Sequence, residues 1–329
     1  MIKNIFIIVA LLLLGMGAGI AVDRTIFKAG PLQSLFSDSH QVRQGGFSLI
    51  NPLLECEIGG ERLSKQFVTF RYQVEAEVNR LISSGEVENM SVYFRDLNNG
   101  LGFGINEKEG FTPASLLKLP VMIAYFKRSG VDPSILKKTY SYTDPQDRNK
   151  KENIKPRDPI MRGKPYTVDD LITQMMVYSD NNAMALLVEN LPIQMQDQVY
   201  TDLGITIPGV RGTEDYMSVS DYASFFRILY NASYLSKDNS QKALSLLTKV
   251  DFSDGIRAGI PKEVVVANKF GERQLGQTQQ LHDCGIVYFN DHPYLLCVMS
   301  RGNDFTKLTS SIKDISHLVY SEVDKQEKL

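Results

Sequence analysis

The feature that most constrains the fold is a long helical stretch, residues 112–250, that separates two sets of strand patterns. Before it, residues 90–97 and 101–105 are apolar or β-branched runs joined by an Asn-Asn-Gly turn, which predicts a hairpin. After it, strand patterns return in three runs: 263–267, 282–289 and 294–300. Strands that flank a helical insert predict an α+β fold.

Helical periodicity appears at both ends of this arrangement. Apolar residues recur at three- and four-residue steps from about residue 64 until Gly85, and again over 307–323, which predicts an opening and a closing amphipathic helix. Inside the helical stretch we expect four helices: 115–127, 169–178, 182–190 and 218–230. The Lys- and Asp-rich segment 143–164 between the first two is expected to be a surface loop.

We therefore expect a single folded domain over residues 64–329. It would be an antiparallel five-stranded sheet flanked by N- and C-terminal helices, with an inserted all-helical subdomain over about 112–250. With 43% hydrophobic and 22% charged residues, the chain has the composition of a globular protein that buries a sizeable core.

The N-terminal segment 1–22 is a candidate for export. Residues 5–22 form an uncharged apolar run behind Lys3, near the lower length limit of a spanning helix. The run predicts a membrane anchor; a cleaved signal peptide, cut near Ala21, and a buried core helix are the alternatives. Anchor and signal both predict an extracytoplasmic protein, held on the outer face of the cytoplasmic membrane or secreted. Residues 23–63 are expected to be a juxtamembrane spacer.

Charge and metal-ligating residues exclude several classes of function. A formal net charge of −2 gives no electrostatic reason to expect a nucleic-acid partner. The four histidines form no i, i+4 pair, and Cys56, Cys284 and Cys297 form no C-x-x-C, so we expect neither a metal nor another cofactor. In an oxidising compartment Cys56 would bridge to one of the other two cysteines; three reduced, buried thiols are the alternative.

Ser115-Leu-Leu-Lys118 is the first of three polar motifs. Serine and lysine three residues apart lie on one helix face, so the amine reaches the hydroxyl and, with its pKa lowered by burial, can act as its base. The same spacing recurs by chance at Ser134–Lys137 and Ser310–Lys313. Only Ser115 stands at the head of a long apolar helix directly after a hairpin, where helix N–H groups can stabilise an oxyanion.

Ser179-Asp180-Asn181 is the second motif, at the junction of two predicted helices. Its hydroxyl can relay a proton and its amide can hold a substrate carbonyl or the lysine. Asp180 is expected to cap the following helix.

Lys269-Phe270-Gly271 is the third motif, immediately after the strand predicted at 263–267. A lysine at a strand edge can bind a substrate carboxylate, and Gly271 lets a ligand lie close to the strand. The alternative for an isolated Lys-x-Gly is a solvated lysine that ends a strand.

Together these motifs resemble the serine β-lactamase and penicillin-binding protein superfamily, whose signatures are S-x-x-K, S-D-N and K-T-G in this order. The resemblance covers residues 64–325 and is greatest to class A β-lactamases, which also carry a lead-in like Gly255–Lys262. It implies a serine acyl-enzyme hydrolase that opens a β-lactam or cleaves a D-alanyl-D-alanine cell-wall peptide.

The resemblance also implies a role for each motif residue. Ser115 would be acylated, Lys118 would act as base or proton relay, and Ser179 would protonate the leaving nitrogen. Further residues are implied in substrate binding: Asn181 at the acyl-side amide, Lys269 at the carboxylate, Gly271 beside the ligand, and the backbone N–H groups of Ser115 and Glu272 as the oxyanion hole.

Two departures from the family pattern bear on substrate and turnover. Phe270 replaces the hydroxyl-bearing residue of K-T-G, which removes one hydrogen bond to a substrate carboxylate and adds a bulky ring. The E-x-x-L-N string that carries the deacylating glutamate of class A enzymes is absent between residues 203 and 218. Glu214 is the candidate there for this base, and a helix-start carboxylate is its alternative role.

A rival function is therefore a membrane-tethered sensor or binding module that holds peptidoglycan or an antibiotic with little turnover. The retained polar residues of the three motifs argue against it, and the two departures argue for it. A purely structural scaffold gives no reason for three polar motifs in this order.

Overall fold

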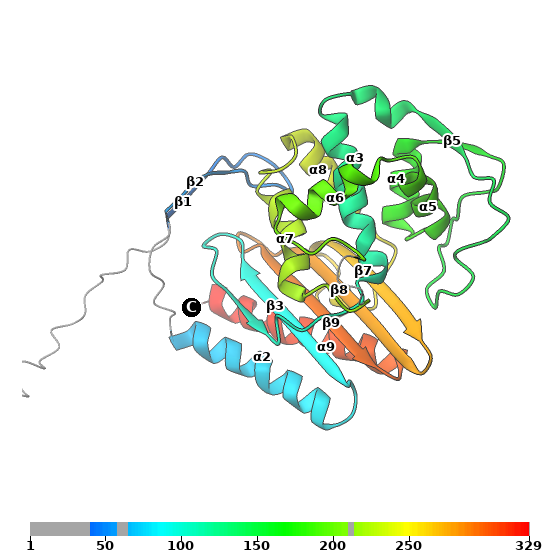
Figure 1. The fold of residues 1–329 in the computed structure, drawn as a ribbon. Coiled ribbons are helices and arrows are strands. Elements are labelled where there is room, and N and C mark those ends of the chain that lie inside the picture. The colour runs from blue at the N-terminus through cyan, green and yellow to red at the C-terminus, as the bar shows by residue number, and fades with distance from the viewer. Residues whose placement is uncertain (1–39, 58–64, 210–213, 329) are drawn as a thin grey trace, which may run out of the picture. The chain divides into compact units, whose positions relative to one another are not determined.

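The computed structural model describes residues 40–57, 65–209 and 214–328. Its centre is an antiparallel sheet of five strands in the order β4-β3-β9-β8-β7 (Figure 1). The strands are β3 (Asn89–Asp96), β4 (Gly102–Ile105), β7 (Val265–Leu275), β8 (Thr278–Tyr288) and β9 (Tyr294–Gly302). The predicted α+β class and the five-stranded antiparallel sheet are confirmed.

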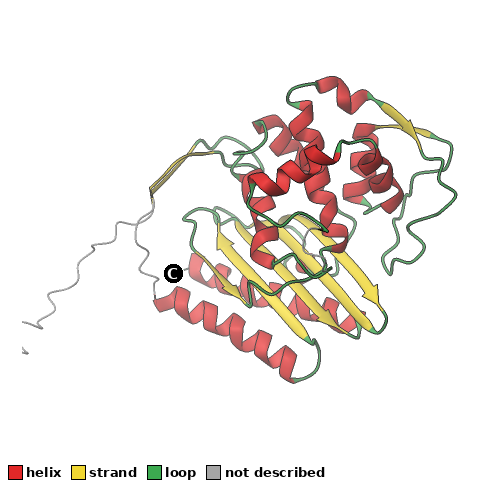
Figure 2. Ribbon diagram, in the orientation of Figure 1, coloured by secondary structure: helices red, strands yellow, loops and turns green. Residues whose placement is uncertain are grey.

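The two faces of this sheet are covered by different parts of the chain. The N-terminal helix α2 (Lys65–Ser83) and the C-terminal helix α9 (Phe305–Glu327) lie side by side on one face, and the helical region covers the other (Figures 1 and 2). Helix α7 (Val219–Tyr230) is the helix of that region that packs on β9, β3 and β8. This confirms the predicted helices at the two ends of the domain.

Aromatic side chains join α2 to the edge of the sheet. The rings of Phe70 and Phe94 are 4.9 Å apart and those of Phe70 and Phe103 are 5.0 Å apart, both in edge-to-face geometry. Each such pair adds about 0.5–1.5 kcal/mol to the burial of the rings. The apolar spacing that predicts this amphipathic helix therefore also identifies Phe70, the residue that packs the helix against the sheet.

The helical region contains two helices that the sequence analysis missed, α6 (Ile193–Asp202) and α8 (Lys237–Leu247). Both are short and amphipathic, and the apolar residues of each are too few to stand out from the neighbouring turns. The region's other described helices are α3 (Lys118–Ser129), α4 (Val168–Val177), α5 (Asn181–Glu189) and α7. Residues 143–164 are mainly loop, as predicted, next to the two short strands β5 (Thr139–Ser141) and β6 (Pro165–Thr167).

Two boundaries differ from the prediction at places that matter for the site. Ser115 lies in a 3-10 turn, η1 (Ala114–Leu117), and the α-helix begins only at Lys118. The strand predicted at 263–267 is much longer, because β7 runs from Val265 to Leu275 through the whole of the third motif. Polar side chains after Ala267 interrupt the apolar pattern although the backbone pairing continues.

Part of the segment expected to be a spacer folds. Strands β1 (His40–Arg43) and β2 (Leu53–Glu57) form a two-stranded sheet, and the N–H of Asn51 donates to the carbonyl of Tyr230 at the end of α7. Ile50 is buried. The candidate anchor, residues 5–22, lies outside the described residues. Within the described part of the chain, no helix has the length and apolarity needed to cross a membrane.

Cys284 and Cys297 face each other across β8 and β9, and both are free and fully buried. Neither therefore takes part in the bridge to Cys56 that the sequence analysis considered. Burial raises the pKa of both thiols, which keeps them protonated at neutral pH.

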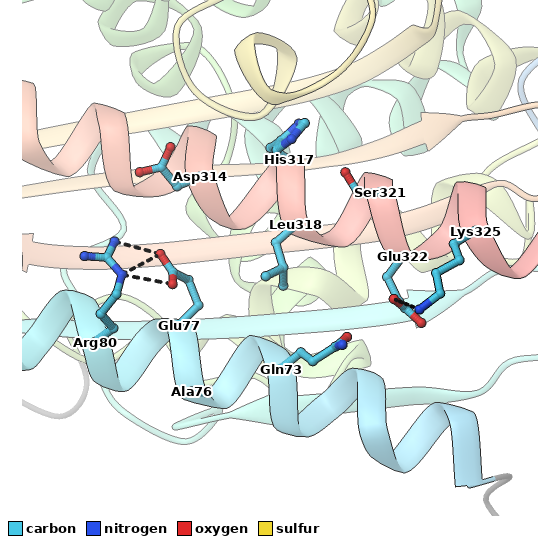
Figure 3. A pocket seen from close by; sticks show the side chains of 10 residues that line it. All are labelled: Gln73, Ala76, Glu77, Arg80, Asp314, His317, Leu318, Ser321, Glu322 and Lys325. Atoms are coloured by element: carbon cyan, nitrogen blue, oxygen red, sulfur yellow. Dashed lines mark hydrogen bonds and ion pairs between the residues drawn. The ribbon is translucent and has the colours of Figure 1, made fainter.

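A groove runs between α2 and α9, on the face of the sheet away from the helical region (Figure 3). Two ion pairs lie along it within single helices, Arg80 with Glu77 on α2 and Lys325 with Glu322 on α9. Exposed pairs of this kind contribute about 0–1 kcal/mol each. The three sequence motifs lie elsewhere, where the helical region meets β7.

Candidate active site

The turn that carries Ser115 has a strained entry. Ala114, directly before it, has a φ of +50°, in the left-handed region of backbone conformation that residues other than glycine rarely adopt. The turn then leads into α3, which is buried along most of its length. Strain of this kind costs about 1–3 kcal/mol and is kept where the surroundings fix the backbone. The hydroxyl of Ser115 is thus presented from a rigid turn.

Lys118 is a fully buried lysine at the start of α3. Its Nζ lies 2.5 Å from Oγ of Ser115, 3.0 Å from Oγ of Ser179 and 2.6 Å from Oδ1 of Asn181. Burial lowers the pKa of this amine to about 7, although nearby carboxylates oppose the shift. A substantial fraction of Lys118 is therefore neutral at pH 7 and able to accept a proton from the hydroxyl 2.5 Å away.

The second motif forms the wall beside Lys118. Ser179 has a φ of +58° and is buried, with its carbonyl accepting from Lys118 Nζ at 2.8 Å. Asp180 caps α5, as predicted, by accepting from the N–H groups of Asn182 and Ala183. The cap and the strained residue before it hold the hydroxyl of Ser179 and the amide of Asn181 on the same side of the turn.

Lys269 is fully buried within β7, whereas the sequence analysis expected it just beyond the end of a strand. Its Nζ lies 3.0 Å from Oγ of Ser179 and donates to the carbonyl of Phe270. Burial and the neighbouring Lys118 lower the pKa of Lys269 well below its usual range. The Oγ of Ser179 thus lies between two lysine amines, and a continuous path joins Ser115, Lys118, Ser179 and Lys269.

Gly271 lets β7 approach the turn of Ser115. A Cβ atom at this position would lie 2.8 Å from the carbonyl oxygen of Pro113 and 3.0 Å from the backbone nitrogen of Leu116. Any side chain here would collide with backbone on both sides of Ser115. The predicted oxyanion donors, the N–H groups of Ser115 and Glu272, therefore belong to two segments that touch at Gly271.

Phe270 is a buried side chain that packs beside the site. It is 3% exposed, and its ring lies 4.5 Å from that of Phe252 between centroids. Lys269 Nζ is 4.1 Å from the centre of the same ring. The hydroxyl that the family pattern supplies at this position is replaced by an aromatic contact with the lysine.

Glu214 does not contact the nucleophile or its base. It forms an ion pair with Arg273 at 2.7 Å, and its side chain is 60% exposed. The hydrogen bonds of Lys118 go to Ser115, Ser179 and Asn181, none of which is a carboxylate. The role of Glu214 as hydrolytic base stays a prediction, and in this arrangement its carboxylate is held by Arg273 at the surface.

The site contains residues that the sequence analysis assigned to a surface loop. Asn181 Nδ2 donates to Oε1 of Glu152 at 2.9 Å, and its backbone N–H donates to Oδ1 of Asn149. The carboxylate of Glu272, expected to contribute only its N–H, accepts from the backbone N–H of Ile154 at 2.7 Å. No motif marks the residues of this loop, because their role depends on contacts with distant segments.

The two other serine–lysine spacings lie apart from this site. Ser134 is exposed in a 3-10 turn and donates to Asp132, and Ser310 is exposed on α9. Of the three spacings, Ser115–Lys118 is the one whose lysine also contacts the second motif.

Solved structures with the same fold were found by comparison. A variant of PBP-A, solved as an acyl-enzyme with penicillin G, matches with a TM-score of 0.66 and 19% identity over 78% of this chain and 97% of that one. A β-lactamase from Xanthomonas campestris pv. campestris matches with a TM-score of 0.66 and 19% identity, over 77% and 98% of the two chains. A class A β-lactamase from Mycobacterium abscessus matches with a TM-score of 0.64 and 18% identity, over 76% and 99%.

At these identities the structural matches establish the fold, while the family follows from the sequence. No curated protein matches the chain. The sequence model of the beta-lactamase enzyme family matches residues 73–323, which include all three motifs and most of the chain. The chain therefore belongs to the beta-lactamase enzyme family, with the serine acyl-enzyme fold that this family shares with penicillin-binding proteins.

Proposed function

We propose that this protein is a serine acyl-enzyme hydrolase that opens a β-lactam amide or cleaves a D-alanyl-D-alanine-type cell-wall peptide. The observation that carries the proposal is the path from Ser115 Oγ through Lys118 Nζ to Ser179 Oγ, with separations of 2.5 and 3.0 Å. A nucleophile, a buried base and a second hydroxyl in contact are what acyl transfer to a serine requires.

In the first half-reaction, neutral Lys118 takes the proton of Ser115 as Oγ forms a bond to the amide carbonyl carbon. The oxygen of that carbonyl becomes an oxyanion, which the N–H groups of Ser115 and Glu272 would stabilise. The tetrahedral species then breaks its C–N bond. The leaving nitrogen receives a proton from Ser179, which is resupplied by Lys118, and an ester on Ser115 remains.

In the second half-reaction, water adds to the ester carbon and the C–O bond to Ser115 breaks, which releases an acid and restores the hydroxyl. This step needs a base for the water, and Glu214 is paired with Arg273. We therefore expect acylation to be faster than hydrolysis. The same observation supports the second candidate function, a penicillin- or peptidoglycan-binding sensor with little turnover.

We further propose that the chain acts outside the cytoplasm, anchored through residues 5–22. The uncharged run in the sequence supports this location, and cell-wall peptide is found on that side of the membrane. Full-length protein is then expected to remain in washed membranes at high salt and to need detergent for release. Recovery in the soluble fraction would contradict an anchor.

The function is tested by following the intact mass of the full chain, in detergent, during incubation with benzylpenicillin. The Ser115→Ala variant is the control, because it removes the nucleophile and changes little else. An adduct of one penicillin that forms on the wild type alone supports the proposal.

The lifetime of that adduct separates the two candidates. An adduct that persists for hours supports the binding or sensing function, whereas a transient adduct with accumulating penicilloate supports a hydrolase. If several β-lactams and a D-alanyl-D-alanine peptide all fail to acylate the folded wild type, the acyl-enzyme proposal is wrong.

A further inference from the structure

Thr112 precedes the turn of the nucleophile Ser115, and each of its polar atoms is held by a side chain from a distant segment. Its N–H donates to Oε1 of Gln280 at 3.0 Å, and its hydroxyl donates to Oδ1 of Asp215 at 2.6 Å. Its carbonyl oxygen lies 2.9 Å from Nε2 of His282. These three partners, Asp215, Gln280 and His282, are here called the Thr112 clamp. A residue bonded through its N–H, its carbonyl and its hydroxyl is fixed in orientation as well as in position.

His282 is the donor to the carbonyl of Thr112, because its other ring nitrogen is already an acceptor. The backbone N–H of Ser300 donates to Nδ1 of His282 at 3.3 Å, so the proton of the neutral ring is on Nε2. Burial lowers the pKa of His282 to about 4, which keeps the ring neutral at pH 7. His282 pairs with Gly271 across β8 and β7, so this part of the clamp belongs to the same sheet as the third motif.

Asp215 is itself held by two further side chains. Its Oδ1 also accepts from Nε2 of Gln280 at 2.9 Å, and its Oδ2 accepts from Nη2 of Arg301 at 2.7 Å. Backbone hydrogen bonds in both directions between Phe111 and Met217 join the two segments beside the clamp. Asp215 therefore connects the chain before the nucleophile to both β8 and β9.

The segment that carries Asp215 is the one in which the class A pattern places its deacylating glutamate. Glu214 lies in this segment, and its carboxylate is paired with Arg273. Asp215, the next residue, bonds the hydroxyl of Thr112. In this chain the segment therefore contributes a carboxylate to the support of the turn that presents the nucleophile.

The chain between Thr112 and Ser115 is short and stiff. The ring of Pro113 restricts its φ, which is −66°. Ala114 follows with a φ of +50°, a strained conformation that persists only where the surroundings hold it. The Oγ of Ser115 then lies 2.5 Å from Nζ of Lys118. A shift of Thr112 is transmitted to this oxygen, because the strained alanine has backbone conformations of lower energy available to it.

We propose that the three residues of the Thr112 clamp are positioning residues for Ser115 in the acylation step. Their hydrogen bonds go to Thr112, so they act on the nucleophile through the backbone of residues 112–115. They hold the strained turn in the conformation that keeps Oγ of Ser115 beside the amine of Lys118. This inference deepens the proposed function and rests on it. It assigns the clamp to the rate of bond formation and not to the binding of substrate.

The test uses a matched pair of substitutions at Thr112. Thr112→Val keeps the shape of the side chain and removes the hydroxyl, whereas Thr112→Ser keeps the hydroxyl. The full-length proteins, in detergent, are incubated with several concentrations of benzylpenicillin, and intact mass gives the maximal acylation rate and the half-saturating concentration. Thr309→Val on α9 is the control, because that hydroxyl donates to a backbone carbonyl within its own helix.

We expect Thr112→Val to lower the maximal rate about 10-fold, because misplacement of a reacting group by about 1 Å can cost about 10²-fold. The half-saturating concentration should change less than about 2-fold, since the lost interaction acts on the transition state. Thr112→Ser should retain most of the wild-type rate, and the control should change neither quantity. A role in stability alone would leave the maximal rate of the folded protein, checked by circular dichroism, unchanged.

A second comparison tests whether the hydroxyl of Thr112 acts through Asp215. In an Asp215→Ala background the partner of this hydroxyl is gone, so adding Thr112→Val should lower the rate by less than about 2-fold further. If Thr112→Val does not fold, Asp215→Ala is compared with Asp215→Asn, which keeps an oxygen that can accept from the hydroxyl. Asp215→Asn should then acylate faster than Asp215→Ala, and equal rates would overturn the inference.

Three further results would overturn the inference and leave the proposed function intact. One is a folded Thr112→Val protein that acylates at the wild-type maximal rate. Another is an equal loss of rate in Thr112→Val and Thr112→Ser, since the hydroxyl would then not be the group that matters. The third is a further loss of about 10-fold when Thr112→Val is added to Asp215→Ala, because the two effects would then be independent. If no donor acylates the folded wild type, the proposed function itself fails, and this is measured without any variant.

Discussion

The two walls of the active site differ in how far they follow the family pattern. One wall, formed by Ser115, Lys118 and Ser179, carries the pattern complete, with each polar atom within 3.0 Å of the next. The other, formed by β7 and the loop of residues 148–154, departs from it at Phe270 and adds the carboxylates of Glu272 and Glu152. The polar residues of the family pattern are thus retained on one side, while the residues of the other side have changed.

This difference indicates that the residues for attack on a carbonyl and the residues for substrate recognition can vary separately. Attack on a carbonyl depends on a few atoms fixed by a turn and one helix, and any change there removes the reaction. Recognition depends on charge and shape along a strand and a loop, where substitutions alter preference. Variants on the two walls should therefore have distinguishable effects.

The largest effect is expected from Lys118→Met, which removes the base and keeps an apolar side chain of similar length. Acylation by any donor should fall by about 10³-fold, within the range for loss of a general base. The measurement is the rate of adduct formation by intact mass, with circular dichroism as a check on folding. A loss of less than about 10-fold would show that another group deprotonates Ser115.

Gly271→Ala tests the contact between the walls. The added Cβ would lie 2.8 Å from the Pro113 carbonyl, so β7 or the turn must shift. We expect a loss of about 1–3 kcal/mol in the free energy of unfolding, as for other overpacked sites, and a decrease of about 10²-fold in acylation from misplacement of the nucleophile. Denaturant unfolding and acylation rates measure the two effects. Unchanged values of both would contradict the close approach.

The pH dependence of acylation reports on Lys118. The amine acts as a base only when neutral, and its pKa is lowered to about 7. The rate should therefore rise about 10-fold per unit as the pH increases below 7, and level off above it, because the neutral fraction follows that titration. A profile that falls with rising pH would contradict the role of Lys118.

The smallest effect on rate is expected from Phe270→Thr, which restores the hydroxyl of the family pattern. Loss of the packing on Phe252 should destabilise the fold by about 3 kcal/mol, as for other large-to-small core changes. If the fold tolerates this, the ratio of acylation by benzylpenicillin to acylation by its methyl ester, which lacks the carboxylate, should rise a few-fold through the added hydrogen bond. A ratio that falls would show that the ring itself assists anionic donors.

The fold could be predicted well from the sequence, and the residues predicted for one wall of the site lie in contact with one another in the structure. Periodicity identified α2, the hairpin of β3 and β4, and α9, because each presents a strong apolar pattern to a single partner. Helices α6 and α8 were missed because their apolar residues are few, and the length of β7 was underestimated because its polar half is held by pairing with β8.

What the sequence by itself determined is the α+β class and the positions of Ser115, Lys118, Ser179, Asn181 and Lys269, since local spacing and chain order identify these residues. Only the tertiary structure decided that Lys269 is buried, that Glu214 belongs to a surface ion pair, and that Glu152 accepts from Asn181 and Glu272 from Ile154. The physical reason is that a lone carboxylate has the same appearance in a sequence wherever it lies. Its protonation and its effect on a substrate depend on burial and on charges brought near it by segments far apart along the chain.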